Sequence, residues 1–239
     1  MKLVFKLFTA AALISGLSVQ AQTVDELVDK HITAIGGKDV INSIKSQIIE
    51  STISVMGTEL PATTTILVGK GFKNVANFNG QDIIQVVTPT GGWLINPLQG
   101  ITTAEPLPED QVKAGQNSFQ VGGDLFNYKE KGSKVELAGT EKVDGKTSYK
   151  MKLTDKDGKL TTLYLDSATS YVVKRESTAN VGGQDVTVVS TFSNHKKSDI
   201  GIVIPYTWTT NQGFELTYII NKITYNTEID PKIFEIPKQ

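Results

Sequence analysis

The chain has 239 residues with a formal net charge of −1, and it contains no cysteine. Without Lys2 and Lys6, which lie in a predicted leader, the net charge becomes −3, and a negative charge argues against nucleic acid or an anionic membrane surface as partner. The lack of cysteine excludes disulfides, thiolate metal sites, a cysteine nucleophile and a lipid attached at a cysteine.

Residues 1–21 have the pattern of a secretory signal peptide. Lys2 and Lys6 supply the positive charge, and Leu7–Leu17 is an apolar run of suitable length that is too short to span a bilayer. Small residues at the −3 and −1 positions predict cleavage between Ala21 and Gln22. The alternative is an uncleaved membrane anchor. Cleavage gives an exported mature chain of 218 residues (239 − 21) that is not anchored by a lipid.

Two helices are predicted at the start of the mature chain. Thr23 and Glu26 have the spacing of a capping box, and Gly36-Gly37 ends the first helix because glycine tolerates the left-handed conformation. The inward-facing residues are Val24, Leu27, Val28, His31, Ala34 and Ile35 in the first helix, and Val40, Ile41 and Ile44 in the second.

From Ser46 onward the hydrophobic period changes to two, which is typical of β-strands. Gly57-Thr58 and Asn79-Gly80 are candidate turns. The strands predicted in this half are a run from Ser46 to Val55, Ala62–Gly69, Phe72–Phe78, Asp82–Thr88 and Gly92–Asn96.

Pro106–Lys131 interrupts the strands. Pro108 with two acidic residues after it predicts a helix start, and Gly122-Gly123 breaks the helical pattern. We expect one or two short helices beside a loop, and locally unstable elements of this kind are often lids.

The second half returns to strands. Tyr149–Leu153, Val186–Phe192, Ile202–Thr209 and Glu215–Tyr225 carry the strand pattern, and Asp144-Gly145 and Asp157-Gly158 predict type I′ hairpin turns. About ten or eleven strands, nearly all antiparallel, are expected in total.

The fold class is therefore mainly β (α+β), with a curved antiparallel sheet and a few helices over its open side. We expect a single domain over residues 22–239, because no linker divides the sequence. Alternation means that one face of the sheet is dry and must be covered. The predicted helices are few for so wide a sheet, which leaves two alternatives: a hydrophobic cavity between sheet and helices, or a sheet that curls and fills itself.

Several short motifs are similar to nucleotide-binding or metal-binding sequences, but the residues around them do not fit such a site. Gly145-Lys146-Thr147 follows a hairpin turn instead of opening a helix, so it does not predict a nucleotide site. Asp155–Gly158 lacks the flanking ligands of a calcium loop. His31 and His195 have no partner at metal-ligand spacing, and His31 is interpreted as a helix-face residue. We expect no enzyme activity, no cofactor and no metal.

Seven aromatic residues are candidates for lining a cavity or its lid, with plain core packing as the alternative for each. Phe119 and Phe126 are the lid candidates, and replacing both with aspartate is expected to remove lipid binding and leave the fold intact. The full set is Trp93, Phe119, Phe126, Tyr128, Tyr164, Phe192 and Trp208.

The order of several short motifs resembles the outer-membrane lipoprotein-sorting (LolA-like) proteins. The motifs are Ala34-Ile35-Gly36-Gly37, the Asp-Gly hairpins, Phe192 followed by Ser193-Asn194-His195-Lys196, Gly201-Ile202-Val203-Ile204-Pro205, and Asn226-Thr227-Glu228-Ile229-Asp230 with Phe234 and Pro237.

This resemblance implies a monomeric half-barrel in the periplasm of a Gram-negative cell. It implies a carrier whose apolar interior holds the acyl chains of a lipoprotein or another lipid, with membrane proteins as donor and acceptor. The alternatives are a sensory or interaction module of the same fold that binds a membrane-anchored regulator, and a hydrolase with an unrecognised site. The chain departs from the family in lacking an arginine in Ser46–Gly71; its one arginine is Arg175.

Overall fold

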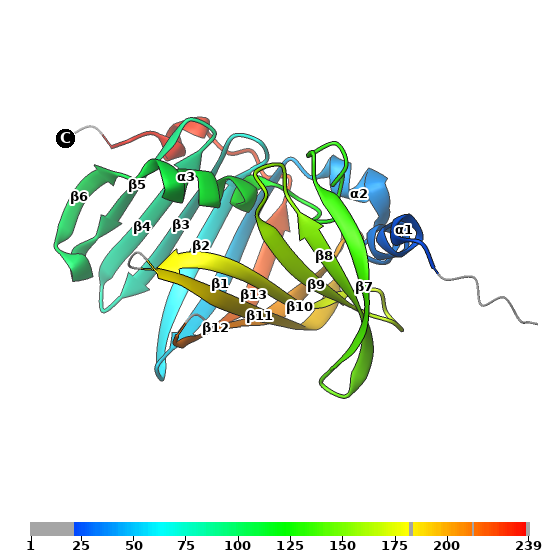
Figure 1. Ribbon diagram of the computed structural model, residues 1–239. Helices are drawn as coiled ribbons and strands as arrows, with labels where there is room; N and C mark the ends of the chain where they lie inside the picture. Colours follow the sequence, from blue (N-terminus) through cyan, green and yellow to red (C-terminus); the bar gives the residue numbers. More distant parts are fainter. Residues whose placement is uncertain (1–21, 182–183, 212, 238–239) are drawn as a thin grey trace, which may run out of the picture.

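The computed structural model describes residues 22–181, 184–211 and 213–237, and the predicted signal peptide lies outside them (Figure 1). The described chain is mainly β, with a 13-stranded antiparallel sheet. The strands are β1 (Ser46–Val55), β2 (Thr58–Leu67), β3 (Gly71–Phe78), β4 (Gln81–Thr88), β5 (Gly91–Asn96), β6 (Ile101–Pro106), β7 (Lys134–Val143), β8 (Lys146–Thr154), β9 (Leu160–Asp166), β10 (Val172–Val181), β11 (Gln184–Lys197), β12 (Val203–Asn211) and β13 (Glu215–Tyr225).

The sheet is open, as the predicted half-barrel requires. Its order is β6-β5-β4-β3-β2-β1-β13-β12-β11-β10-β9-β8-β7, so β6 and β7 are the two edges. The expected count of ten or eleven strands is too low. The edge strands β6 and β7 are mostly exposed and lack a regular buried alternation, which is the signal that identifies strands from sequence.

The first two helices form as predicted. In α1 (Val24–Ala34) the Glu26 amide donates to Thr23 Oγ1 at 3.3 Å and the Thr23 amide donates to Glu26 Oε2 at 2.9 Å, which completes the capping box. A break follows at Gly36, whose φ is +125° and where a Cβ would lie 2.9 Å from the Gly201 carbonyl oxygen. The shorter α2 (Gly37–Ser43) then places Ile41 in the core.

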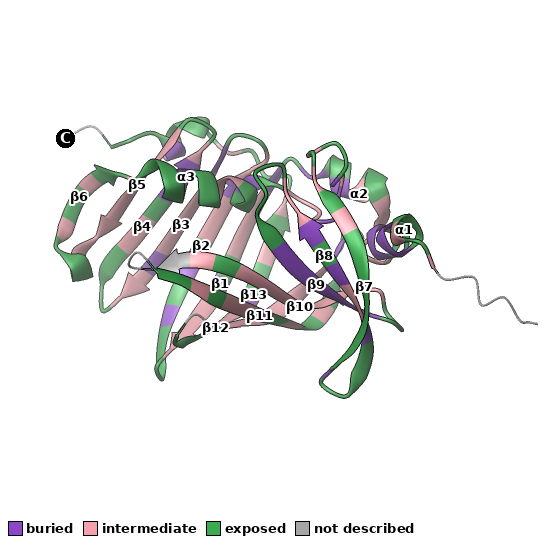
Figure 2. Cartoon of the chain, viewed as in Figure 1, coloured by how far each residue is buried: buried purple, intermediate pink, exposed green. Residues whose placement is uncertain are grey.

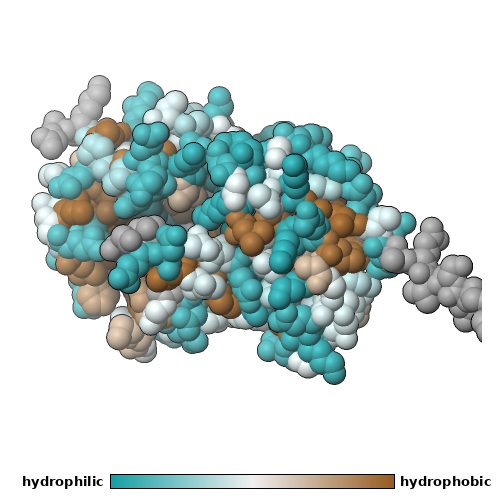
Figure 3. All heavy atoms as spheres, in the orientation of Figure 1, coloured by the Kyte–Doolittle hydropathy of each residue, from teal (hydrophilic) through white to brown (hydrophobic). Residues whose placement is uncertain are grey.

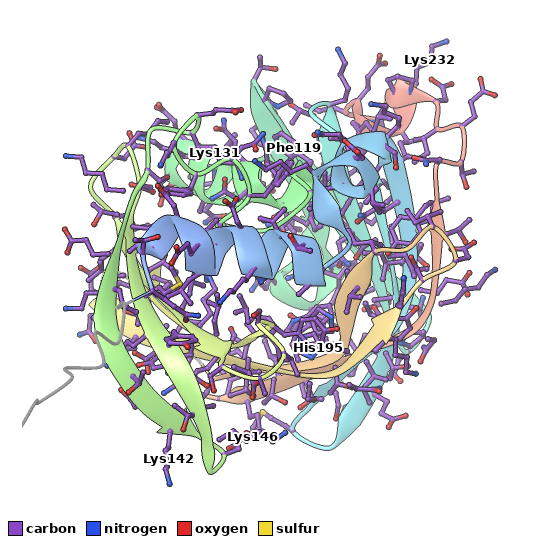
Figure 4. The ribbon with its side chains drawn as sticks, turned by 90° about the vertical axis from the view of Figure 1, so that its right-hand side faces the viewer. Phe119, Lys131, Lys142, Lys146, His195 and Lys232 are labelled. Carbon is purple, nitrogen blue, oxygen red and sulfur yellow. The ribbon has the colours of Figure 1, made fainter. Side chains whose placement is uncertain are left out.

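The inserted segment contains α3 (Glu109–Gly115) and the 3₁₀ helix η2 (Gln116–Phe119), with Pro108 at the N-cap. Two further 3₁₀ helices are η1 (Pro97–Gln99) and η3 (Pro231–Phe234). Figure 4 shows that the sheet curves around α1, so the face that carries α1 and α3 is concave. The opposite, convex face carries η3, which packs against β3 and β4.

The buried apolar residues form three clusters at the ends of the sheet instead of one central core (Figure 2). The largest joins α1 and α2 to β8, β9 and the loop around Phe126. The second joins α3 and η2 to Ile66 and Val87, and the third places Phe234 beside Val86 on the convex face. Of the central strands β1 and β13, Ile49 and Tyr225 pack against these clusters and are only partly buried.

The hairpin turns follow the predicted chemistry with two corrections. Asp144-Gly145 and Asn79-Gly80 have positive φ at both residues, as type I′ turns require. At Asp157-Gly158 only Gly158 has positive φ, so this turn is not type I′; the Asp155 carboxylate instead accepts from the amides of Asp157 and Lys159. The β1–β2 turn lies at Met56-Gly57, one residue earlier than predicted.

Gly145→Val is expected to lower the free energy of unfolding by about 1–2 kcal/mol, because a β-branched residue resists positive φ. Gly145 has φ +77° and open space around it, so backbone strain is the cost that remains. Gly91→Val is the matched control, since Gly91 also faces open space but lacks positive φ. Equal urea midpoints for the two variants would contradict the turn assignment.

Candidate functional site

Four side chains form a row across the concave face, here called the concave strip: Ile53 from β1, and Phe192, Trp208 and Tyr218 from the consecutive strands β11, β12 and β13. Each is paired in direct register with the next across β1, β13, β12 and β11. Directly paired residues of an antiparallel sheet share a face. The Trp208 and Tyr218 rings stack with centroids 4.8 Å apart and planes 9° apart.

The concave strip is apolar because the strands alternate. The neighbours of Trp208 and Tyr218 face the other way, where the Thr209 and Thr217 hydroxyls hydrogen-bond at 3.1 Å. Burial raises the pKa of the Tyr218 hydroxyl, so this ring is uncharged at neutral pH.

All four strip side chains are partly exposed. The described helices pack chiefly on other strands: α3 on β4 and β5, η2 on β2 and β3, and α1 on β7. Figure 3 likewise shows hydrophobic patches among hydrophilic side chains on the side of the molecule in view. A partly exposed row of aromatic and aliphatic side chains can bind an apolar ligand non-covalently.

An ion pair ties the inserted segment to the concave face beside this strip. Arg175 Nε lies 3.0 Å from Asp124 Oδ2, and the two side chains are 32% and 27% exposed. Arg175 Nη1 also donates to Ser177 Oγ at 3.1 Å. Arg175 is in direct register with Ser190 on β11, so its side chain shares the face of the strip.

Phe192 and Trp208, two of the predicted site residues, lie in the concave strip. Phe119, Phe126 and Tyr128 lie in the inserted segment as predicted, but they are only 3%, 6% and 8% exposed. Phe119 and Phe126 belong to different core clusters. The Tyr128 hydroxyl donates to Asp25 Oδ1 at 2.7 Å, which ties the segment to α1.

Tyr164 faces away from the concave side, contrary to the prediction. Its neighbours Leu163 and Leu165 pack in the α1 cluster, so alternation turns Tyr164 to the convex face. There its ring lies between Lys150 and Lys174, whose Nζ atoms are 5.4 and 4.7 Å from the ring centroid.

Trp93 also lies on the convex face, so it does not line the concave side. It is in direct register with Val86 and packs under η3, and its indole Nε1 donates to the Phe234 carbonyl oxygen at 3.0 Å. The aromatic character of Trp93 and Tyr164 predicts that they are buried, but it does not indicate on which face of the sheet their side chains lie.

Sequence reasoning missed Ile53 and Tyr218 as site residues. The usable signal is the alternation Leu216, Tyr218, Ile220 along β13. Folding a hairpin about Gly213 sets Tyr218 opposite Trp208, as observed.

A separate hollow of about 440 Å³ lies at the end of α1, lined by residues that include Thr33, Tyr171, His195 and Lys197. The His195 ring stacks on Tyr171 at 4.7 Å, and buried His31 lies nearby with its Nδ1 2.8 Å from the Ser170 carbonyl oxygen. Figure 4 shows His195 beneath α1 and Phe119 on the other side of that helix. A second hollow of about 450 Å³ lies beside η3.

Stability is expected to fall as the pH drops from about 7.5 to 5. Burial lowers the pKa of His31, and a hydrogen bond to Ser170 opposes this only in part. Burial likewise lowers the pKa of His195. The unfolded chain, with a histidine pKa of about 6.5, then binds more protons than the folded chain in this range, so acid favours unfolding.

Urea midpoints measured across this range check the expectation. His31→Gln should flatten the pH dependence, and His31→Gln with His195→Gln should flatten it further. An unchanged slope in the double variant would assign the effect to other groups.

Among the described helices, none has the length and apolar content needed to cross a bilayer. The described residues also contain no cluster of three or more histidine, aspartate or glutamate side chains suited to a metal ion.

No protein-family model matches the sequence, and no curated protein matches it either. The fold is similar to several solved structures. A domain from Vibrio parahaemolyticus assigned to outer membrane lipoprotein sorting aligns with a TM-score of 0.59 at 14% identity, over 87% of this chain and 95% of that chain. A LolA superfamily protein from Nitrosomonas europaea gives 0.59 at 13% identity, over 90% and 98%.

A DUF1329 family protein from Desulfovibrio piger aligns with a TM-score of 0.52 at 14% identity, over 89% of this chain and 97% of that chain. At sequence identities this low, the structural similarity is evidence for a shared fold only. They agree with the order of the short motifs in the sequence, which points to the same architecture. The chain has the fold of the LolA superfamily and of the outer membrane lipoprotein-sorting structures.

Proposed function

We propose that the protein is a non-enzymatic carrier that binds the acyl chains of a lipoprotein or another lipid along the concave strip. The observation that carries this proposal is the row Ile53, Tyr218, Trp208 and Phe192, which is apolar and partly exposed on the concave face. Contact of these apolar side chains with water is unfavourable, and a bound apolar ligand would shield them from it.

The energetics suit a carrier. Each methylene removed from water contributes about 0.8 kcal/mol, so about ten methylenes on the strip contribute roughly 8 kcal/mol before the cost of ordering the chain. Binding of that strength shields a lipid in water and still permits its release. We place the protein in the periplasm, with membrane proteins as lipid donor and acceptor.

The inserted segment is suited to act as the lid over bound lipid. The buried rings of Phe119 and Phe126 anchor the segment in the core, so it does not move as a whole. The Asp124–Arg175 ion pair has partly exposed side chains, and contacts of this kind are weak and reversible. In this proposal, release of the ion pair lets the part of the segment around Asp124 shift and widens access to the strip.

Contact quenching by a brominated fatty acid tests the proposal, because bromine quenches only tryptophans that it touches. Trp208 lies in the strip, whereas Trp93 is buried on the convex face. We expect saturable quenching in the wild type and none in Trp208→Phe. Quenching that persists in Trp208→Phe places the lipid elsewhere. No quenching, together with a protein partner that remains bound on purification, supports the interaction module instead.

A further inference from the structure

The β1–β2 hairpin ends in a residue that its own fold does not explain. Met56 is the first residue of a turn with positive φ at both positions, 49° and 79°. Such turns favour Asn, Asp or Gly, and two other turns of this chain use Asn79-Gly80 and Asp144-Gly145. Met56 is 90% exposed, so packing does not compensate for the unfavourable backbone conformation.

A second exposed apolar side chain lies beside it. Val55 is in direct register with Leu216, so the Met56 turn adjoins the β12–β13 turn that carries Phe214. Phe214 is 46% exposed. Figure 1 shows these two hairpin tips together at the lower edge of the molecule.

The two tips continue the concave strip outward. Ile220, Tyr218 and Leu216 alternate along one face of β13, and Phe214 lies in the turn just before this strand. Ile220 is 6% exposed, whereas Phe214 is 46% exposed. An apolar path therefore runs from the interior of the sheet to its rim. An acyl chain following this path leaves the protein between the two tips.

The β7–β8 hairpin reaches the same side of the molecule. Figures 1 and 4 are related by a turn about the vertical, and both show the β1–β2 and β7–β8 tips at the bottom. Figure 4 shows Lys142 and Lys146 at the β7–β8 tip, pointing away from the body. Neither lysine forms a close ion pair with a described residue, although the charge of Lys146 contributes to lowering the pKa of Asp166.

We propose that this side of the molecule docks onto a phospholipid bilayer, with Met56 and Phe214 inserted at the interface and Lys142 and Lys146 against lipid phosphates. Two apolar side chains are far too small a surface for a stable protein interface, which needs about 800 Å² on each partner. They are sufficient for a transient contact with a membrane. This inference goes beyond the proposed function, since it assigns a membrane-contacting surface outside the strip.

Co-sedimentation of the full-length exported protein with phosphatidylcholine vesicles tests this membrane-docking proposal. Met56→Asn with Phe214→Thr is expected to lower vesicle binding about tenfold. Met56→Asn creates the preferred Asn-Gly turn, so the variant should be at least as stable as the wild type. Lys142→Gln with Lys146→Gln should weaken binding less than the tip variant does, because phosphatidylcholine carries no net charge and offers only its individual phosphates.

Leu160→Thr is the matched control, because Leu160 is 47% exposed on a strand but lies at the β8–β9 turn. It should bind vesicles as the wild type does. The inference is overturned if the wild type does not bind, or if the tip variant binds equally well. Quenching by soluble brominated fatty acid should be the same in the tip variant and the wild type, so failure of the carrier proposal is seen separately.

Discussion

Trp208→Glu is expected to lower the affinity for a soluble fatty-acid probe by about a hundredfold or more. The substitution places a carboxylate in the middle of the concave strip, between Phe192 and Tyr218. An unpaired charge in an apolar site costs several kcal/mol, and each 1.4 kcal/mol is about tenfold in affinity. Titration of a fluorescent fatty acid measures the effect.

The matched control for this variant is Ile219→Glu. Ile219 is adjacent to Tyr218 on β13 but faces the convex side, where it is 40% exposed. It should bind the probe like the wild type. Equal loss in both variants indicates a general effect on β13, and equal retention in both excludes the concave strip as the binding site.

Phe119→Asp with Phe126→Asp is expected to unfold the protein. The burial of both rings reverses the expectation drawn from the sequence, that this change removes binding and leaves the fold intact. Loss of each buried ring costs about 3–5 kcal/mol, and a buried carboxylate adds to it. The sum approaches the whole stability of a domain, about 5–15 kcal/mol.

Circular dichroism melts of the double variant check this result. Phe214→Asp is the control, because this half-exposed phenylalanine at a hairpin tip is in no core cluster and its replacement should leave the melt unchanged. If the double variant stays folded and no longer binds the probe, Phe119 and Phe126 line an open cavity, as the sequence predicted.

Local features of the fold could be predicted from the sequence because their causes are local. The capping box of Thr23 and Glu26, the break at Gly36 and the turn at Asp144-Gly145 depend on neighbours within a few residues. The alternating strands and the helical insertion are equally local, and together they predict a curved antiparallel sheet with few helices. The unnamed strands include the edge strands β6 and β7, whose weak burial removes the alternating pattern, and the interior strands β9 and β10. In β9 the residues are buried on both faces, so no alternation marks it.

The candidate site could be predicted only in part. Phe192 and Trp208 were recognised as candidates by their aromatic character, which predicts participation in an apolar surface. The same criterion selected Trp93 and Tyr164, which face the other side of the sheet. A one-residue change of register reverses the face of every side chain in a strand, and register depends on pairing partners.

The sequence by itself determined the helices, most of the strands and the fold class, because periodicity, caps and turn residues act over a few positions. Tertiary structure decided which aromatic residues meet. Phe192, Trp208 and Tyr218 are brought together by the pairing of the consecutive strands β11, β12 and β13, and Ile53 joins them through the pairing of β1 with β13. The complete site exists only once the long-range pairing of β1 with β13 forms, and the face on which it lies depends on the register of all three pairings.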